Sequence, residues 1–175
     1  MTMTASARKF DSFEAAFRMA FEEEISGETF FAALAEAEQD PRQAALWAKL
    51  ARIENRTVAA LRPLADTLGL APQDESAVRQ AGRAEAAEWQ ALPFVGAMEI
   101  IVRDYPGSYL AEFQAMQATA PDQARASVQL LIDHEVAIIE MARAELAGTG
   151  ESEVPLDDYL AKVATLIDSI PDRRV

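Results

Sequence analysis

The sequence predicts an all-α protein in which two helical hairpins form a four-helix bundle and a short helix follows. Apolar residues recur at helical spacing along most of the chain, and no stretch shows the sustained alternation of a half-buried strand. The sequence also aligns with itself after a shift of 80 residues, which indicates a duplicated hairpin. Two hairpins packed face to face bury their apolar stripes together. We expect the bundle to cover residues 6–148 and a tail to cover residues 149–175.

The first half of the chain predicts two long helices. The first is expected from Ser6 to Glu38, and Asp40-Pro41 ends it and begins the second, because proline suits the first helical turn. The second helix stops before Gly69, with Pro63 bending its last turns. The apolar stripes contain Phe10, Phe13, Phe17, Phe21, Phe31 and Leu34 in the first helix, and Leu46, Leu50, Leu61 and Leu64 in the second.

Shorter elements follow before the last long helix. Residues 71–74 form a loop, and a polar helix is expected from Glu75 to Gln90. The next helix follows Pro93, and Pro106-Gly107 disturbs it, because proline lacks a backbone donor and glycine is a weak helix former. A long apolar helix is then expected from Pro121 to Gly148.

The tail has the pattern of a short amphipathic helix. Pro155 is followed by apolar residues at helical spacing, namely Leu156, Leu160, Val163 and Ile167. We expect this helix to pack on the bundle or on a second subunit.

Charge and composition exclude several classes of protein. Lys and Arg number 16 against 29 Asp and Glu, and the net charge of −13 repels phosphate backbones and anionic lipid, so we expect no nucleic-acid or membrane partner. The absence of cysteine excludes disulfides and Cys-held iron–sulfur centres, and we expect no haem. A single histidine excludes sites that need several imidazoles from one chain. Because neither a secretory signal nor an apolar run of about 20 residues is found, we expect a soluble cytoplasmic protein.

Acidic residues interrupt the apolar stripes. Glu24 falls on the stripe of the first helix, and Glu54 falls on that of the second. A buried carboxylate is costly unless it is paired, hydrogen-bonded or bound to a metal. Converging helices bring several such groups together, which is the geometry of a carboxylate-bridged metal site.

The internal repeat extends this set of candidates. It aligns Glu24 with Asp104 and Glu54 with His134, whose neighbour Glu135 lies on an apolar stripe. Either His134 or Glu135 faces the core, since adjacent helical residues are rotated by about 100°. The candidate metal ligands are therefore Glu24, Glu54, Asp104, His134 and Glu135.

Four of these five candidates also have a second interpretation. Glu24 ends an acidic run of the kind that usually faces solvent. A lone histidine is more often packed or exposed than bound to a metal. Arginines beside the other acids offer surface ion pairs: Arg52 and Arg56 for Glu54, and Arg103 for Asp104.

The segment from Glu24 to Leu64 resembles the first hairpin of the rubrerythrin-like branch of the ferritin-like superfamily. The resemblance rests on Glu24-Ile25-Ser26-Gly27-Glu28-Thr29-Phe30-Phe31, on the turn at Asp40-Pro41, and on Leu50-Ala51-Arg52-Ile53-Glu54-Asn55-Arg56-Thr57, which is similar to the family's Leu-Ala-x-x-Glu-x-x-His motif. The second hairpin matches only through the repeat. The chain differs from the family at Thr57 and at Ala137 or Ile138, where the family has histidines, and at Phe31, where it often has tyrosine.

The resemblance implies a metal site. In the family, carboxylates and Glu-x-x-His pairs hold two iron ions that react with peroxide, oxygen or ferrous iron. For this chain the resemblance implies a ferritin-like bundle that binds iron or manganese, has oxidoreductase-type activity and forms a homodimer. Carboxylates also suit magnesium and calcium. The missing histidines favour an alternative, a metal-free bundle that acts as an oligomeric structural or binding module.

Overall fold

The computed structural model describes residues 7–169, and this range is helical without any strand, which confirms the all-α prediction. Ser6 and residues 170–175 of the expected tail lie outside the described range. The helices are α1 (Phe13–Ala37), α2 (Pro41–Leu68), α3 (Glu75–Trp89), α4 (Phe94–Asp104), α5 (Tyr109–Thr119), α6 (Arg125–Ala147) and α7 (Val154–Ser169). Two 3₁₀ turns, η1 (Tyr105–Gly107) and η2 (Asp122–Ala124), precede α5 and α6.

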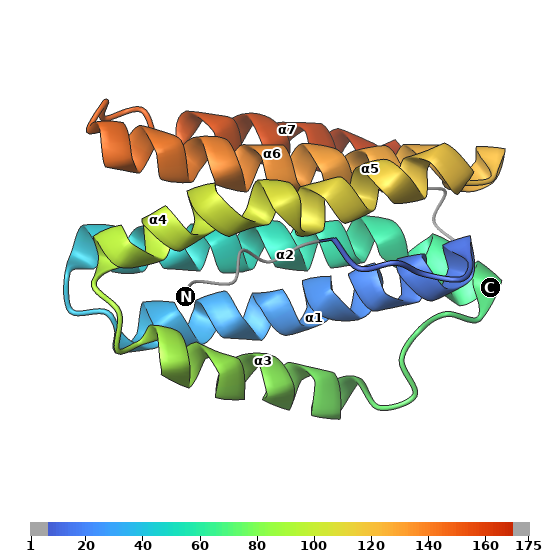
Figure 1. The fold of residues 1–175 in the computed structure, drawn as a ribbon, viewed down its shortest axis with the longest axis horizontal. Helices are drawn as coiled ribbons and strands as arrows, with labels where there is room; N and C mark the ends of the chain where they lie inside the picture. Colours follow the sequence, from blue (N-terminus) through green and yellow to red (C-terminus); the bar gives the residue numbers. More distant parts are fainter. Residues whose placement is uncertain (1–6, 170–175) are drawn as a thin grey trace.

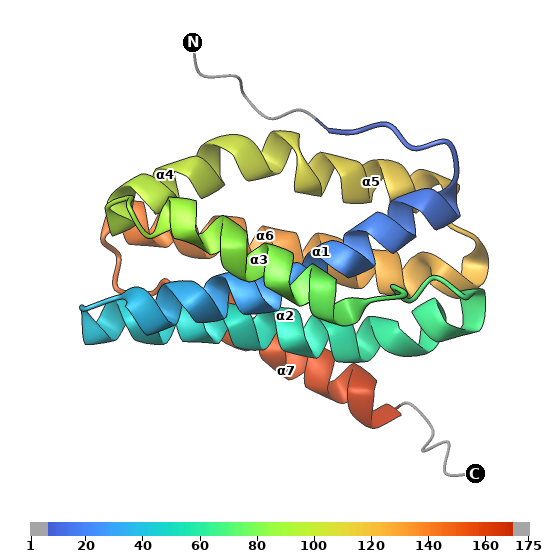
Figure 2. The same ribbon diagram turned by 90° about the horizontal axis from the view of Figure 1, so that it is seen from below.

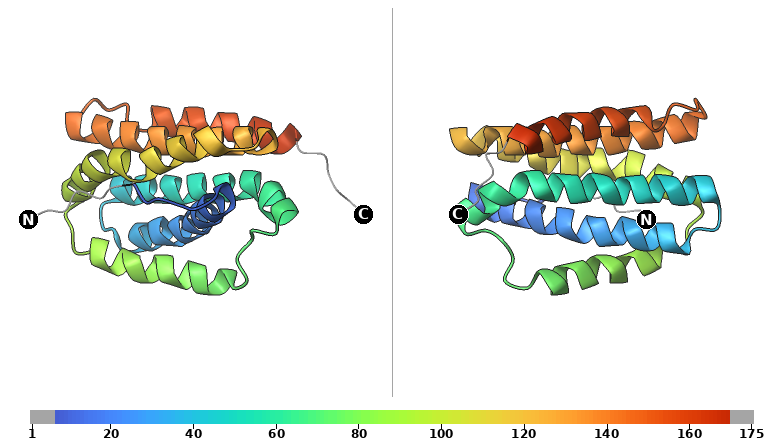
Figure 3. Two further views of the ribbon diagram at one scale, coloured as in Figure 1. Left: turned by 45° about the vertical axis from the view of Figure 1, so that its right-hand side comes forward. Right: turned by 180° about the vertical axis from the view of Figure 1, so that it is seen from behind.

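The core lies between α1, α2, α6 and the broken helix formed by α4 and α5 (Figure 1). α1 packs against α2 and α5, and α6 packs against α2, α4 and α5, so these helices enclose one interior. α3 covers the outer side of α1, and α7 packs on α2 and α6 on the other side of the molecule (Figure 2; Figure 3). Of the two positions expected for the tail helix, the one on the bundle is observed.

The first helix begins at Phe13, so the predicted start at Ser6 is wrong. Ser12 has an extended backbone, and its hydroxyl accepts a hydrogen bond from the Ala15 amide, which caps the helix there. Arg8 then ties the preceding segment to the bundle: its guanidinium binds Glu112 of α5 and Glu23 of α1.

The other predicted ends of the long helices agree with the structure except at the start of α6. α2 begins at Pro41 after the Asp40 cap, continues through Pro63 and ends before Gly69, whose φ of 66° is left-handed. Gly148, with φ of 64°, ends α6 in the same way. α6 itself begins at Arg125 rather than at Pro121, because η2 occupies the residues between them.

The predicted disturbance at Pro106-Gly107 separates α4 from α5. These residues lie in η1, and the Ser108 amide bonds to the carbonyls of Asp104 and Tyr105 as the helix restarts. The break changes the helical register of α5 relative to α4. This change determines which side chains of α5 face the interior.

The interior is apolar along most of its length. Phe17, Phe21, Leu50, Leu131 and Ile138 are fully or almost fully buried, as the stripes predict. Within residues 7–169 no helix has the length and hydropathy needed to cross a bilayer.

Candidate functional site

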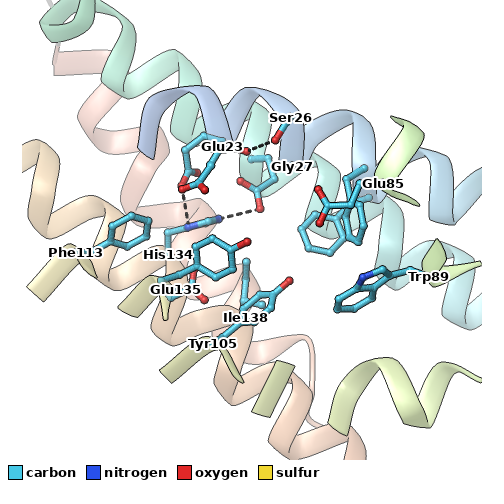
Figure 4. A pocket seen from close by; sticks show the side chains of 15 residues that line it. Glu23, Ser26, Gly27, Glu85, Trp89, Tyr105, Phe113, His134, Glu135 and Ile138 are labelled. Carbon is cyan, nitrogen blue, oxygen red and sulfur yellow. Dashed lines mark hydrogen bonds and ion pairs between the residues drawn. The ribbon is translucent and has the colours of Figure 1, made fainter. Parts of the chain in front are cut away.

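A cavity of about 150 Å³ interrupts the apolar interior (Figure 4). It lies between α1, α2, α3, α5, α6 and η1. Most of its lining side chains are acidic or aromatic: Glu23, Glu24, Glu54, Glu85 and Glu135, with Phe30, Phe31, Trp89, Tyr105, Tyr109 and Phe113. His134, Ser26, Gly27 and Ile138 complete the wall.

Glu24, Glu54 and His134 form a cluster at one side of the cavity. His134 Nδ1 is 3.5 Å from Glu24 Oε1, and His134 Nε2 is 3.2 Å from Glu54 Oε1. One ligand atom offered by each of the three side chains lies within 4.8 Å of the others. All three residues are at most 4% exposed, so the prediction that Glu24 and Glu54 face inward is confirmed.

His134 and Glu135 are both buried, although only one of them was expected to face the core. The reason is that α6 is enclosed on two sides, by α2 and α7 and by α4 and α5. The ring of His134 lies 5.7 Å from that of Tyr159 in α7 and approaches Glu24 and Glu54. Glu135 lines the same cavity outside the three-residue cluster.

Asp104 is not brought to the cavity. Its carboxylate pairs with Arg103, with Nη2 2.6 Å from Oδ2, which was its second interpretation. The break at η1 explains the difference, because Tyr105 and Tyr109 supply the cavity wall instead. The alignment of Glu24 with Asp104 in the repeat therefore does not extend to their positions in space.

Gly27 makes room for one of the clustered carboxylates. A Cβ atom at residue 27 would lie 3.0 Å from Glu54 Cδ, closer than ordinary van der Waals contact. The absence of a side chain thus lets Glu54 reach the interior beside α1.

Burial dominates the electrostatics of the acidic residues. It raises the pKa of Glu54 and of Glu135 to about 8, and it raises the pKa of Glu24 well above its ordinary value. For Glu24 the charge of His134 opposes this rise, and the nearby Glu54 carboxyl adds to it. A cation bound among these groups would restore their charged forms.

Several buried polar atoms of the cavity have no hydrogen-bond partner in the protein. Five such side-chain atoms occur among residues 7–169, and four of them are Glu24 Oε2, His134 Nδ1, His134 Nε2 and Glu135 Oε1. Buried polar groups are nearly always paired, and leaving one unpaired costs about 1–3 kcal/mol. These four atoms are concentrated in one cavity, where each His134 nitrogen also lies within 3.5 Å of a carboxylate oxygen.

Thr57, at the position where the Leu-Ala-x-x-Glu-x-x-His motif has its histidine, is hydrogen-bonded to Tyr159 of α7. The Thr57 hydroxyl donates to the Ile53 carbonyl and shares a 2.6 Å hydrogen bond with the Tyr159 hydroxyl. Sequence reasoning missed Tyr159, although its spacing from Leu156 and Val163 places it on the buried stripe of α7.

Glu85 and Trp89 of α3 and Tyr105 and Tyr109 at the helix break were also missed as cavity residues. The sequence of α3 does not predict that Glu85 and Trp89 line a cavity, because this helix is mostly polar and exposed. The two tyrosines are marked only by their closeness to Pro106-Gly107.

Comparison of the chain with models of protein families, with curated protein sequences and with solved structures found no significant match. A function is therefore inferred from the geometry and chemistry of the cavity alone.

Proposed function

We propose that the protein binds one divalent metal ion, iron or manganese, through Glu24, Glu54 and His134, and that it has an oxidoreductase-type activity. We further propose that the helices around the core adopt a ferritin-like arrangement. The observation that supports the metal proposal is the convergence of two buried carboxylates and one buried imidazole, whose ligand atoms lie within 4.8 Å of one another.

The donor set suits such an ion. Two ligands of the same ion lie at most about 4–5 Å apart, since ordinary metal–ligand bonds are about 2.0–2.6 Å long. The 4.8 Å limit that encloses the ligand atoms of the cluster is compatible with this span. Carboxylates suit manganese, and the imidazole adds a nitrogen donor that suits iron.

A single ion fits these residues better than a pair. The positions that would supply further histidines hold Thr57, whose hydroxyl already bonds to Tyr159, and Ala137 or Ile138. A bound iron or manganese ion would supply one-electron chemistry toward oxygen or peroxide. Glu24, Glu54 and His134 would hold the ion, and the surrounding aromatic side chains would limit the access of water.

Metal analysis tests the proposal directly. Protein purified without chelator or affinity metal is stripped, dialysed against Mn²⁺ or against Fe²⁺ without oxygen, and analysed for metal content. We expect about one ion per chain. We expect Glu24→Gln and Glu54→Gln each to weaken binding by more than about tenfold, because replacing even a residue that only hydrogen-bonds to a metal ligand lowers the affinity by about tenfold or more.

Glu112→Gln is the matched control. Glu112 is similarly buried but binds Arg8 outside the cavity, so this variant should retain the metal. Absence of bound metal in the wild-type protein, or equal binding by the Glu54→Gln variant, would contradict the proposal.

A metal-free bundle that acts as an oligomeric structural or binding module is the second candidate function. It is favoured by the Thr57–Tyr159 hydrogen bond, which fills a position that would supply a ligand in the family motif. Under this alternative, neither ion binds at a stoichiometric level, and the cavity serves another ligand.

A further inference from the structure

Glu85 marks the side on which the cavity meets solvent. It is the only exposed residue among the described residues that line the cavity, and Trp89, one helical turn later in α3, is half-buried. The cluster residues Glu24, Glu54 and His134 are buried. Figure 4 shows Glu85 and Trp89 across the cavity from His134. The cavity therefore runs from an opening beside α3 to the buried cluster.

Glu85 also carries the unpaired negative charge of this opening. The other acidic wall residue that is not buried, Glu23, pairs with Arg8, and their closest charged atoms are 2.8 Å apart. In the part of the chain that the structure describes, no basic side chain forms an ion pair with Glu85. The two arginines of α3, Arg79 and Arg83, each pair with a glutamate of α1. A cation that approaches the opening therefore meets the uncompensated charge of Glu85.

The charge and the cavity act on a cation together. A cleft with walls of low dielectric focuses the field of its charged residues and raises the association rate of an oppositely charged ligand. At the inner end, Glu24 Oε2 is buried without a hydrogen-bond partner in the protein. Glu85 lies outside the group of ligand atoms that could hold an ion there. Its charge can therefore affect how fast an ion arrives without contacting the bound ion.

We propose that divalent cations enter the cavity past Glu85 on their way to Glu24, Glu54 and His134, and that the charge of Glu85 speeds their entry. This inference rests on the proposed metal site and adds the route by which the ion reaches it.

The association rate of Mn²⁺ tests the route. Chelator-treated protein is mixed with Mn²⁺ in a stopped-flow instrument, with a fluorescent indicator reporting the free ion, and excess chelator then gives the dissociation rate. At about 0.1 M salt, where charges act over about 10 Å, we expect Glu85→Gln to lower the association rate constant by about three- to fivefold. The dissociation rate should stay within about twofold. At about 1 M salt the difference in association should fall below about twofold, because screening is stronger.

Glu140→Gln is the matched control for the loss of one charge. Glu140 is exposed on α6 and lies beside α7, on the other side of the molecule from α3 (Figure 2). Its replacement should leave the association rate within about 1.5-fold of wild type. Equal association rates for Glu85→Gln and Glu140→Gln would overturn the proposal. Faster dissociation with unchanged association in Glu85→Gln would place Glu85 on the bound ion, which also contradicts it.

The absence of cysteine allows the charge to be restored at the same position. Glu85→Cys introduces a single thiol, which methanethiosulfonate reagents convert to a disulfide that carries either a sulfonatoethyl group or a neutral hydroxyethyl group. We expect the sulfonate to return the association rate to within about twofold of wild type, and the hydroxyethyl group to leave it as slow as in Glu85→Gln. Equal rates for the two modified proteins would mean that charge at this position does not speed entry.

Equilibrium binding separates this proposal from the metal site on which it rests. Binding of about one Mn²⁺ per chain, with the same association rate in wild type and Glu85→Gln, contradicts only the route of entry. If wild-type protein binds no Mn²⁺ at equilibrium, the metal site itself is contradicted, and the route with it.

Discussion

Gly27 controls the distance between α1 and the carboxylate of Glu54. A Cβ atom at this position, 3.0 Å from Glu54 Cδ, would require the carboxylate to move by a few tenths of an ångström. The replacement therefore affects a cluster residue without changing any ligand. It also improves the helix, since alanine is favoured over glycine by about 1 kcal/mol in a helix interior.

Gly27→Ala should separate binding from stability. We expect Mn²⁺ affinity to fall by about tenfold, because metal sites are sensitive to small displacements of their ligands. The free energy of unfolding should change by less than about 1 kcal/mol, as better helix propensity offsets the displaced side chain. Dialysis against Mn²⁺ and urea unfolding measure the two effects.

Gly96→Ala is the control for this experiment. A Cβ atom there would meet only Pro93 Cδ at 3.7 Å, an ordinary contact. It should leave Mn²⁺ binding unchanged and raise stability by up to about 1 kcal/mol. If Gly27→Ala behaves like Gly96→Ala in both assays, the position of Glu54 does not matter to the site.

At the scale of the elements, α3 lies unusually close to α1. A Cβ atom at Gly82 would lie 2.0 Å from the Ser26 carbonyl oxygen, and the Thr29 hydroxyl donates to the Arg79 carbonyl across the same interface at 2.7 Å. This contact positions Glu85 and Trp89 at the cavity, because both belong to α3.

Gly82→Ala should therefore separate the two helices. The added methyl group meets backbone that cannot rotate away, so we expect the protein to lose about 2 kcal/mol or more of stability. Urea unfolding measures this loss, and unchanged stability relative to Gly96→Ala would show that α3 docks without this close approach.

Helix boundaries were predictable where a cap is encoded locally. Asp40-Pro41, Gly69 and Gly148 mark ends by their own backbone preferences, and the structure agrees with all three. The start at Phe13 was not predicted, because the apolar pattern continues to Phe10 and hides the Ser12 cap. A helix predicted from apolar spacing is therefore too long when an apolar residue lies just outside the true end.

At the scale of the whole molecule, stability should depend on pH through the buried carboxyls. The pKa of Glu54 and of Glu135 is raised from 4.5 to about 8 on folding. Below pH 4.5 both states are protonated, and the favourable contribution is fully present. As pH rises toward 8 the unfolded chain loses these protons first, so the stabilisation is progressively lost.

Metal-free protein should thus become less stable between pH 5 and 8, by roughly 1 kcal/mol per pH unit for each group. Carboxyls whose pKa is lowered, such as Glu75 and Glu145, titrate below this window. Repulsion within a chain of net charge −13 acts in the same direction. The contribution of the cavity is therefore the difference between wild type and Glu54→Gln, measured by urea unfolding, and identical slopes would contradict it.

The candidate site was predictable only within one helix at a time. The inward orientation of Glu24 and Glu54 follows from their places on apolar stripes, and their burial confirms it. Asp104 lies away from the cavity because η1 changes the helical register between α4 and α5. The spacing of apolar residues does not predict that change. Tyr159 belongs to α7, outside the expected bundle, and its ring lies 5.7 Å from that of His134. This contact depends on how α7 packs on α6, which the spacing within one helix does not predict.

The ion pair between Arg8 and Glu112 has a consequence for folding kinetics. The two residues are 104 positions apart in the sequence, so closing this contact early would cost more chain entropy than one ion pair returns. We therefore expect the pair to form after α1 and α5 have docked. Contacts that are absent from the folding transition state slow unfolding and leave the folding rate nearly unchanged, so we expect Arg8→Ala to unfold faster than the wild-type protein and to fold at nearly the same rate.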